Sequence, residues 1–305
     1  MKNGTVTLSF DCEGKWGMAD ISTGWDVSLT RNNLLKAYEF MLKTLQEYNI
    51  SATFAFVGAF TESREMFIEE VLPLLTSKNY SSWLNNSIER IIDKEDEGWF
   101  MPELLSLVKE YDIHEIATHG YTHIPFNMLD IDDVKIELGL IESWAKKHNI
   151  ECQSLVYPRN IIEHQDLLSK FGIFGYRDIP NIFANFLVPK LFKTLLEEVL
   201  IFKEAQNIEV SKPAKIPGGV FVNWQFSFRK YIPELISMLK YKSMIRDAKL
   251  KCRVAHFWLH PHNLITSPST KNLFKKLCEE IAVQRDEMSL DVKRQNDYFV
   301  GNIHK

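Results

Sequence analysis

The sequence predicts an α/β fold built on a parallel sheet, which is either open or closed into a barrel. Apolar runs of strand length alternate with amphipathic segments of helix length along most of the 305 residues, as in repeated strand–helix units. Polar and charged residues follow directly after several of the apolar runs. With 45% hydrophobic and 25% charged residues, the chain can bury a complete core, so we expect residues 1–305 to form one domain.

The individual elements follow from hydrophobic periodicity. The predicted strands are rich in β-branched and aromatic residues, and several end at Gly, Pro or a charged residue. They cover residues 6–10, 52–57, 113–118, 155–157, 174–177 and 253–259. The two clearest helices carry apolar side chains at helical spacing and cover residues 31–48 and 132–148.

Two stretches, at about 60–110 and 180–250, interrupt this alternation, and we interpret both as insertions on the scaffold. The first contains Ser/Asn-rich turns and an acidic run, and the second contains an apolar helix at 183–202 and another around 233–245. Residues 183–192 are rich in aromatic side chains, which would also suit a membrane interface. Because Glu197 and Glu198 leave no cationic face, we favour a helix that packs on its own domain.

Charge and composition exclude several classes of protein. A net charge of −4 and a pI near 6.2 argue against binding to nucleic acid. No uncharged apolar run of about 18 residues occurs, so stable membrane insertion is not expected. The N-terminus lacks the pattern of a signal peptide, and the four cysteines form no C-x-x-C pair, which suits free thiols. We therefore expect a cytoplasmic protein, and the sequence sets no oligomeric state.

Two histidines after the predicted strand at 113–118 suggest a metal site. His119 and His123 can hold one divalent ion if a carboxylate from another strand completes the set. The absence of Glu at positions 120 and 121 excludes the H-E-x-x-H arrangement of metalloproteases. Because Gly120 and Pro125 disfavour a long helix, we expect a turn from strand to loop to present the pair.

Two carboxylates after the first predicted strand can complete that site. Asp11 and Glu13 lie at i and i+2, so both side chains point the same way from an extended segment. The carboxyl ends of parallel strands meet on one face, which brings these acids near the histidines. One acid can bind metal while the other remains free as a base. Cys12 should face the other way, although a thiolate also suits zinc, so Glu13 and Cys12 both remain candidate ligands.

With these residues in place, the sequence resembles the polysaccharide deacetylase family, the NodB-homology group of carbohydrate esterases. The matching segments are 7–11 for the start of T-F-D-D, 52–58 for the second strand, 119–123 for H-[ST]-x-x-H, 157–160 for the third motif and 257–262 for the last. Gly120 replaces Ser/Thr in the second motif, and Arg159 is displaced after Pro in the third. Cys12 stands where the second Asp is usual, so Glu13 fits a D-x-E variant branch.

The resemblance implies a distorted (β/α)7-type barrel with a bound divalent metal, most simply zinc. It implies Glu13, His119 and His123 as metal ligands, Asp11 as general base and His260 as general acid. Arg159 is expected to pair with Asp11 or another acid on the same face. Further residues are considered as secondary candidates. Trp16, Tyr157, Asn160 and His262 are expected in the substrate pocket, Arg177 and Asp178 to orient the acid histidine, and His256 in the core.

The function implied is hydrolysis of an N-acyl group, most simply N-acetyl, from an amino sugar or glycan precursor, as in the synthesis of cell-surface polysaccharide. A first alternative is a metal-dependent amidohydrolase that acts on a non-sugar amide such as a ureide or cyclic imide. A second is a non-catalytic barrel that binds glycan through Trp16, Trp25, Trp83 and Trp99. A thiol hydrolase using Cys12 has little support, because no local signature singles out this cysteine.

Overall fold

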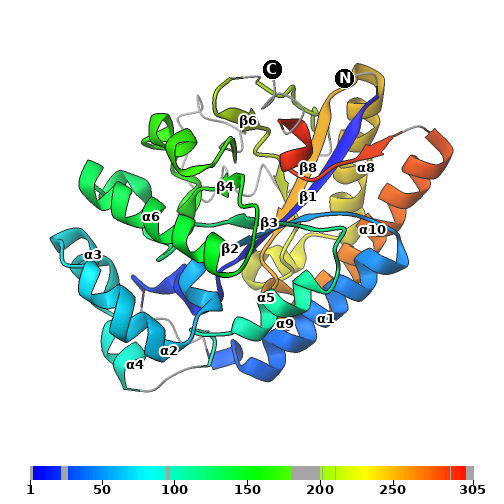
Figure 1. Ribbon diagram of the computed structural model, residues 1–305. Helices are drawn as coiled ribbons and strands as arrows, with labels where there is room; N and C mark the ends of the chain where they lie inside the picture. The colour runs from blue at the N-terminus through cyan, green and yellow to red at the C-terminus, as the bar shows by residue number, and fades with distance from the viewer. Residues whose placement is uncertain are drawn as a thin grey trace.

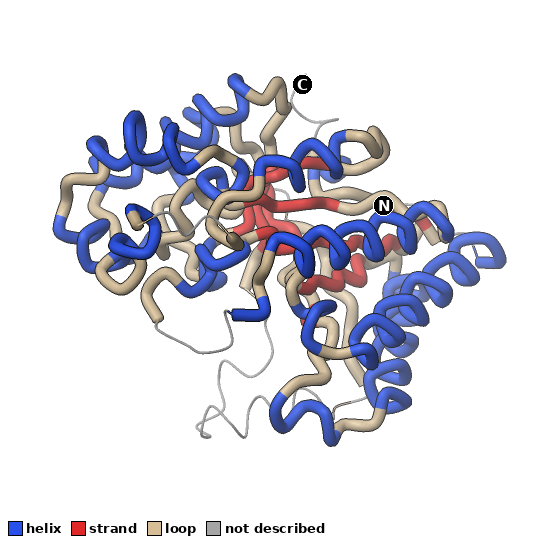
Figure 2. Tube along the Cα trace, turned by 90° about the horizontal axis from the view of Figure 1, so that it is seen from below, coloured by secondary structure: helices blue, strands red, loops and turns tan. Residues whose placement is uncertain are grey.

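The computed structural model describes residues 3–21, 27–93, 97–179, 200, 202–209, 211–288 and 290–299. Its centre is a sheet in which every strand pair along the path is parallel, and helices surround this sheet (Figures 1 and 2). The strand order is β6-β5-β4-β3-β2-β1-β8-β7, with β9 paired to β1 off this path. The predicted α/β fold, a curled parallel sheet of the distorted (β/α) barrel type, is confirmed.

The strand bounds agree closely with the prediction for six strands. The strands are β1 (Thr5–Cys12), β2 (Thr53–Phe56), β3 (Glu115–Thr118), β4 (Ser154–Val156), β5 (Gly175–Arg177), β6 (Ala214–Ile216), β7 (Val220–Phe221), β8 (Val254–Leu259) and β9 (Asp291–Val292). Strands β6, β7 and β9, which are two or three residues long, are not among the predicted strands. Residues 180–250 were interpreted as a second insertion, but part of this stretch, β6 and β7, belongs to the sheet.

Helices cover the outside of the sheet. They are α1 (Arg31–Glu47), α2 (Arg64–Met66), α3 (Lys78–Leu84), α4 (Ile88–Ile92), α5 (Pro102–Lys109), α6 (Ile131–Lys147), α8 (Glu234–Lys251), α9 (Asn263–Thr266) and α10 (Pro268–Met288). Three of them begin at side-chain caps, since Thr30 accepts from the Asn33 amide, Ser63 from the Met66 amide, and Asp130 from the Asp132 and Asp133 amides. The predicted apolar helix at 183–202 lies almost wholly outside the described residues. None of the described helices combines the length and apolar character that crossing a bilayer requires.

The side chains of β1 alternate between the helix-covered face of the sheet and its inner face. Phe10 packs against Phe54 and against Phe274 of α10, with ring centroids 4.8 and 5.9 Å apart. The alternate residues face the other way, and the Thr7 hydroxyl lies 2.7 Å from the hydroxyl of Tyr298. Because side chains alternate along a strand, Asp11 shares this inner face.

The amino end of the inner face holds a hydrogen-bonded polar cluster. Glu115 accepts from the Thr53 hydroxyl at 2.7 Å, from the Asn296 amide at 3.1 Å and from the Ser154 hydroxyl. Tyr298 adds contacts to two threonines of β1. The segment after α10 therefore fills this end of the sheet. The carboxyl end carries the candidate site.

Candidate metal and catalytic site

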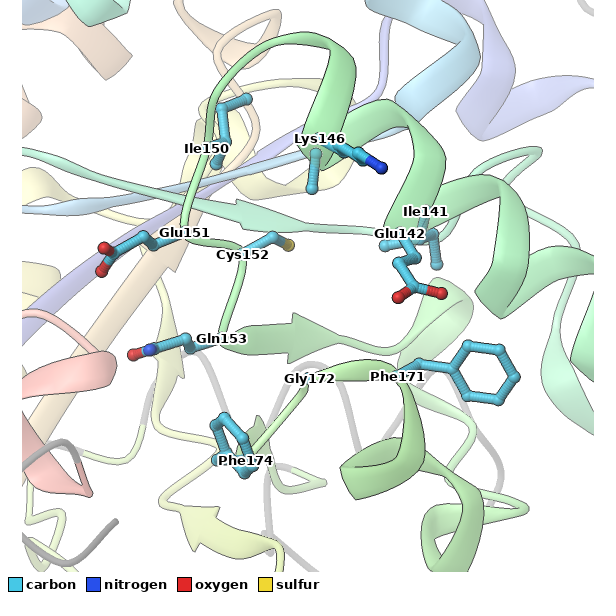
Figure 3. Close-up of a pocket in the computed structure, with 11 residues that line it drawn as sticks. Ile141, Glu142, Lys146, Ile150, Glu151, Cys152, Gln153, Phe171, Gly172 and Phe174 are labelled. Atoms are coloured by element: carbon cyan, nitrogen blue, oxygen red, sulfur yellow. The ribbon is translucent and has the colours of Figure 1, made fainter. Parts of the chain in front are cut away.

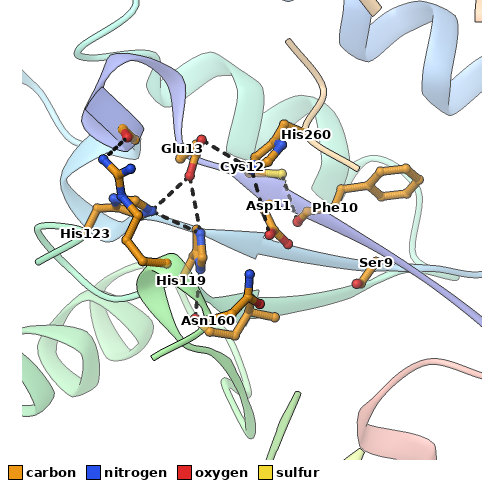
Figure 4. A network of polar contacts seen from close by, with 12 residues as sticks. Ser9, Phe10, Asp11, Cys12, Glu13, His119, His123, Asn160 and His260 are labelled. Carbon is orange, nitrogen blue, oxygen red and sulfur yellow. Dashed lines mark hydrogen bonds and ion pairs between the residues drawn. The ribbon is translucent and has the colours of Figure 1, made fainter. Parts of the chain in front are cut away.

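The residues predicted to form the site meet at the carboxyl edge of the sheet. Asp11 lies near the end of β1 and Glu13 directly after it, while His119 follows β3 and His260 follows β8. Figure 4 shows these side chains pointing toward one another, with Glu13 between the histidines. The register explains this, because Asp11 pairs with Ala55 of β2, and Phe10 pairs with Leu259 immediately before His260.

Glu13, His119 and His123 form a compact triangle of ligand atoms. Glu13 Oε2 lies 2.9 Å from His123 Nε2 and 3.4 Å from His119 Nε2, and the two nitrogens are 3.2 Å apart. Ligands about 2.1 Å from a tetrahedral ion are separated by about 3.4 Å, so these three atoms match one face of such a site. All three residues are buried. The donor set therefore fits a divalent metal ion with a fourth position left for water or substrate.

The backbone around His119 fixes which ring nitrogen faces the triangle. His119 Nδ1 lies 2.8 Å from the carbonyl oxygen of Val156. Because a carbonyl can only accept, Nδ1 must carry the hydrogen, which leaves the Nε2 lone pair facing Glu13. Metal-binding histidines commonly donate their second ring N–H in this way.

His123 is held neutral and in a restricted backbone conformation. Burial lowers the pKa of its imidazole to about 4, although contact with Glu13 opposes this shift. A neutral imidazole is the form that binds metal. His123 has a φ of 62°, in the left-handed region that non-glycine residues seldom adopt. As the sequence predicted, the loop after β3 presents the pair rather than a helix.

Glu13 is ionised beside these imidazoles. Burial alone would raise the pKa of this carboxyl, but its contacts with His260 and His123 hold it well below its usual range. Its side chain lies against Gly17 in the 3-10 helix Gly14–Met18, where a Cβ atom would come 2.2 Å from Glu13 Oε1. Glycine at position 17 therefore makes room for the carboxylate.

Cys12 points out of the site, as the alternation along β1 requires. It is fully buried, and its Sγ lies 3.6 Å from the Phe10 carbonyl oxygen. Burial raises the pKa of this thiol well above its usual range, and Tyr38 of α1 is its hydrogen-bond partner. Of the two candidate ligands at this strand end, only Glu13 faces the histidines.

Asp11 is paired with Arg177, not with Arg159. Arg177 Nη1 and Nη2 each lie 2.7 Å from a different carboxylate oxygen of Asp11, and both residues are buried. Burial would raise the pKa of Asp11, but the Arg177 guanidinium outweighs this and lowers it. The base candidate is therefore ionised and held in a fixed orientation. The sequence had suggested Arg177 only for orienting the acid histidine.

Arg159 joins two loops at the rim of the site. Its Nη2 lies 2.6 Å from Asp20 Oδ1 and 2.8 Å from the Gly17 carbonyl oxygen, and its guanidinium lies 5.7 Å from the Trp83 ring centroid. Arg159 therefore pairs with another acid, the second of the two arrangements expected. It has a φ of 58°, which directs the chain away from β4.

A second layer of hydrogen bonds lies beneath Asp11. His256 Nδ1 lies 2.5 Å from the Pro217 carbonyl oxygen, so Nδ1 carries the hydrogen and Nε2 accepts. Ser9 Oγ lies 2.8 Å from this Nε2 and 3.3 Å from Arg177 Nη1. The hydroxyl therefore donates to His256 and accepts from Arg177. His256, predicted as a core histidine, supports the arginine that holds Asp11.

His260 flanks the carboxylates from the β8 side. Its Nε2 lies 3.4 Å from Glu13 Oε1 and 4.0 Å from Asp11 Oδ2, and its side chain is 22% exposed. Asn263 Oδ1 accepts from the His260 amide at 3.0 Å and lies 3.3 Å from Nδ1. Partial exposure and a fixed ring orientation both suit a group that exchanges protons with solvent and substrate.

His262 stacks on His260 and defines a second group of ligand atoms. The two rings are nearly parallel, with centroids 4.8 Å apart, and burial lowers the pKa of His262 to about 3. Glu13, His260 and His262 together could also hold an ion. We favour the triangle with His119 and His123, because its three distances match tetrahedral coordination and all its members are buried.

The remaining predicted pocket residues are mostly structural. Tyr157 packs against Phe126 and Tyr176, and Asn160 Oδ1 accepts from Arg177 Nη2 at 2.9 Å. Trp16 is fully buried and donates from Nε1 to the Trp99 carbonyl oxygen at 2.7 Å. The expectation that Trp16 lines a pocket is therefore not met.

Three of the four tryptophans suggested for glycan binding are buried. Trp16, Trp83 and Trp99 are each at most 2% exposed, and Trp25 lies outside the described residues. Large apolar rings are favoured in the core wherever neighbouring segments can cover them. The sequence could not distinguish that case from exposure at a binding surface.

A surface hollow lies beside the amino ends of β4 and β5 (Figure 3). Its lining includes Glu151, Cys152 and Gln153, just before β4, and Phe174, just before β5. None of the predicted catalytic or metal-binding residues lines it. The carboxyl edge therefore remains the candidate site.

Comparison with known families supports the relationship that the motifs predicted. Residues 22–159 match the family model described as polysaccharide deacetylase. Residues 22–159 are thus similar to the polysaccharide deacetylases. The matched region includes His119, His123 and Arg159, whereas Asp11, Glu13 and the residues after position 159 lie outside it. A comparison with curated proteins found no match.

Several solved structures share the fold. A protein from Mycobacterium smegmatis, described as a polysaccharide deacetylase, aligns with a TM-score of 0.61 at 12% identity over 98% of this chain and 90% of its own. An allantoinase aligns with a TM-score of 0.55 at 11% identity over 96% and 88%. A carbohydrate esterase family 4 pseudoenzyme from Bacillus anthracis, in a variant with restored activity, gives 0.50 at 11% over 97% and 67%. At such identities the likeness shows the fold alone.

The packing of Glu13 against Gly17 gives a first prediction. Gly17→Ala should displace the Glu13 carboxylate, because the new Cβ would lie 2.2 Å from Oε1, and should weaken Zn²⁺ binding in a chelator-competition titration. Gly139→Ala is a matched control, since no atom lies within 4 Å of a Cβ at that helical position. Unchanged Zn²⁺ affinity in folded Gly17→Ala would contradict the assignment of Glu13 as a ligand.

The buried His256 gives a second prediction, on stability and pH. Its pKa is lowered to about 3, mainly by burial and next by Arg177, whereas an unfolded histidine titrates near pH 6.5. The unfolded chain therefore takes up the proton first, so the stability contributed by neutral His256 is present above about pH 6.5 and is lost as the pH falls toward 3.

Urea titrations at pH 7 and pH 5 measure this loss. The fall in unfolding free energy between these pH values should be smaller in His256→Gln than in the wild type by about 2 kcal/mol. Thr7→Val, which removes a hydroxyl from the same inner face but no titrating group, should retain the wild-type dependence. Identical pH dependence in His256→Gln and wild type would show that His256 is not held neutral.

Proposed function

We propose that this protein is a metal-dependent hydrolase that removes an N-acyl group, most simply N-acetyl, from an amino sugar or glycan precursor. The observation that carries the proposal is the triangle of Glu13, His119 and His123 beside an ionised, Arg-paired Asp11. Family homology supports the reaction class. The fold alone would not, because the solved structures that share it include a pseudoenzyme and an allantoinase.

The metal site would be formed by Glu13, His119 and His123. A divalent ion bound there, most simply zinc, would supply Lewis acidity toward the acyl oxygen and would favour deprotonation of water. The chain itself prepares the ligands. Burial keeps His123 neutral, the contact of His119 Nδ1 with the Val156 carbonyl oxygen directs His119 Nε2 inward, and Glu13 supplies a negative charge.

Asp11 is proposed as the general base. Both of its oxygens accept from Arg177, but each carboxylate oxygen has a second lone pair that can accept a proton from water. Water then attacks the acyl carbon as Asp11 takes the proton. Arg177, fixed by Asn160 and Ser9, keeps the carboxylate ionised and correctly oriented throughout.

His260 is proposed as the general acid. When the C–N bond breaks, the leaving nitrogen takes the electron pair and needs a proton, which protonated His260 donates from Nε2. The products are the free amine and the carboxylic acid. Because His260 Nε2 lies 4.0 Å from Asp11 Oδ2, the base and acid candidates border one reaction space on neighbouring strands.

The sugar substrate is the part of the proposal that depends most on homology. A non-sugar ureide or cyclic imide is the second candidate, since an allantoinase shares the fold. A panel of N-acetylated sugars, chito-oligomers, ureides and cyclic imides, assayed for product release, separates the two. All four cysteines are free thiols, which supports an enzyme acting in a reducing compartment.

The third prediction tests the metal site. Wild-type protein should bind about one divalent ion per chain by elemental analysis, and His119→Ala combined with His123→Ala should abolish both this binding and amide hydrolysis. His164→Ala, which changes a histidine bonded to the Leu129 carbonyl oxygen, serves as control and should retain both. Full metal content in the double variant would refute the site.

The fourth prediction concerns the acid. His260→Ala should reduce amide hydrolysis by about 10²- to 10⁴-fold, the usual contribution of general acid catalysis. The loss should be much smaller on an activated aryl acetate, whose leaving group needs no proton. His262→Ala is the matched comparison and should have the smaller effect on the amide. Equal losses of His260→Ala on both substrates would show that it acts structurally.

A further inference from the structure

The loop that carries the two metal-site histidines has an unfavourable backbone conformation at His123. Its φ is 62°, whereas Gly120, with a φ of 81°, reaches the left-handed region without steric cost. Non-glycine residues in sparsely populated regions cost roughly 1–3 kcal/mol and persist only where the surroundings fix them. The separation of 3.2 Å between the imidazole Nε2 atoms depends on this conformation.

Glu137 of α6 holds this loop by hydrogen bonds to its backbone. It is fully buried, and its Oε1 accepts from the Tyr121 amide at 2.7 Å and from the Thr122 amide at 2.8 Å. The Thr122 hydroxyl lies 3.3 Å from Oε1 and 3.1 Å from Oε2. One side chain therefore satisfies two consecutive backbone N–H groups that would otherwise be buried without partners, at a cost of about 1–3 kcal/mol each.

Helix α3, from the stretch first interpreted as an insertion, supports the same loop. The Tyr80 hydroxyl donates to Glu137 Oε2 at 3.2 Å, and Trp83 Nε1 donates to the Thr122 carbonyl oxygen at 3.1 Å. On the other side, the amides of Gly58 and Ala59 donate to the carbonyl oxygens of Gly120 and Tyr121, at 3.0 and 2.9 Å. Hydrogen bonds thus restrain both the backbone N–H groups and the backbone carbonyl groups of the loop.

We propose that Glu137 is a positioning residue for the metal site, and that α3 assists it through Tyr80 and Trp83. By accepting from the amides of residues 121 and 122, Glu137 holds the two histidines at the spacing that one ion requires. This inference rests on the proposed metal site. Glu137 does not contact the ligand atoms, and it acts as a hydrogen-bond acceptor for the backbone of the loop.

The test compares Glu137→Leu with Glu137→Gln. Leucine removes both acceptors, so Zn²⁺ affinity in a chelator-competition titration should fall by about 10- to 100-fold, as for other supporting partners of metal ligands. Glutamine keeps a carbonyl oxygen for the two amides and should restore affinity to within a few-fold of wild type. In metal-free protein, amide hydrogen exchange at residues 121 and 122 should speed up in Glu137→Leu only.

Asp247 provides the matched control. It is a carboxylate on helix α8 whose Oδ2 accepts from the Ala205 backbone amide at 3.0 Å, so it also restrains a segment outside its helix, but not the histidine loop or α3. Asp247→Leu should lower the unfolding temperature while leaving Zn²⁺ affinity unchanged. Should Glu137→Leu fail to fold, Glu137→Asp withdraws the carboxylate by one methylene and should lower the affinity in the same direction.

Three outcomes would overturn the inference. They are wild-type Zn²⁺ affinity in folded Glu137→Leu or Glu137→Asp, equal losses in Glu137→Leu and Glu137→Gln, and an equal loss in the Asp247 control. Absence of Zn²⁺ binding by the wild-type protein would instead refute the metal site itself. In that case unchanged amide exchange in Glu137→Leu would separately disprove the loop restraint.

Discussion

The alternation of side chains along β1 is the constraint on which both core and site depend. Phe10 and Cys12 face the helices, and between them Asp11 faces the interior with Ser9 and Thr7. A shift of one residue in register would exchange these faces, placing a carboxylate among aromatic rings and Phe10 beside Arg177. Parallel pairing to β2 and β8 prevents that shift and also fixes which strand ends adjoin Asp11.

Buried charge makes the site a single interdependent unit. Asp11 is balanced by Arg177, and contacts with His260 and His123 lower the pKa of Glu13. Breaking a buried ion pair by removing one partner commonly costs 3–5 kcal/mol, because it leaves a charge uncompensated. The supporting groups Ser9, His256 and Asn160 therefore matter for orientation as well as for packing. The same network that keeps Asp11 ionised also keeps it in place.

The fold alone does not identify the reaction of this protein. Proteins with this curled parallel sheet include one described as a polysaccharide deacetylase, an allantoinase and a pseudoenzyme, at identities of 11–12%. A shared scaffold therefore leaves the chemistry open, and the decision falls to residues at the strand ends. Here those residues supply a triangle of candidate metal ligands, a paired carboxylate and a partly exposed imidazole. The proposed hydrolysis of an amide gives each of these groups a role.

The sequence by itself determined the elements with a clear period and the residues at the ends of their strands. The bounds of β1, β2 and α1, and the position of His119 and His123 after a strand, follow from local pattern. Only the tertiary structure decided which arginine meets Asp11. Arg177 ends the short strand β5 and Arg159 lies just after the short strand β4, so their positions in the sequence are similar. The tertiary structure also decided that Trp16 is buried and that Glu137 contacts the histidine loop. A carboxylate on a helix looks the same in sequence whether it faces water or two backbone amides, since the difference lies in segments distant along the chain.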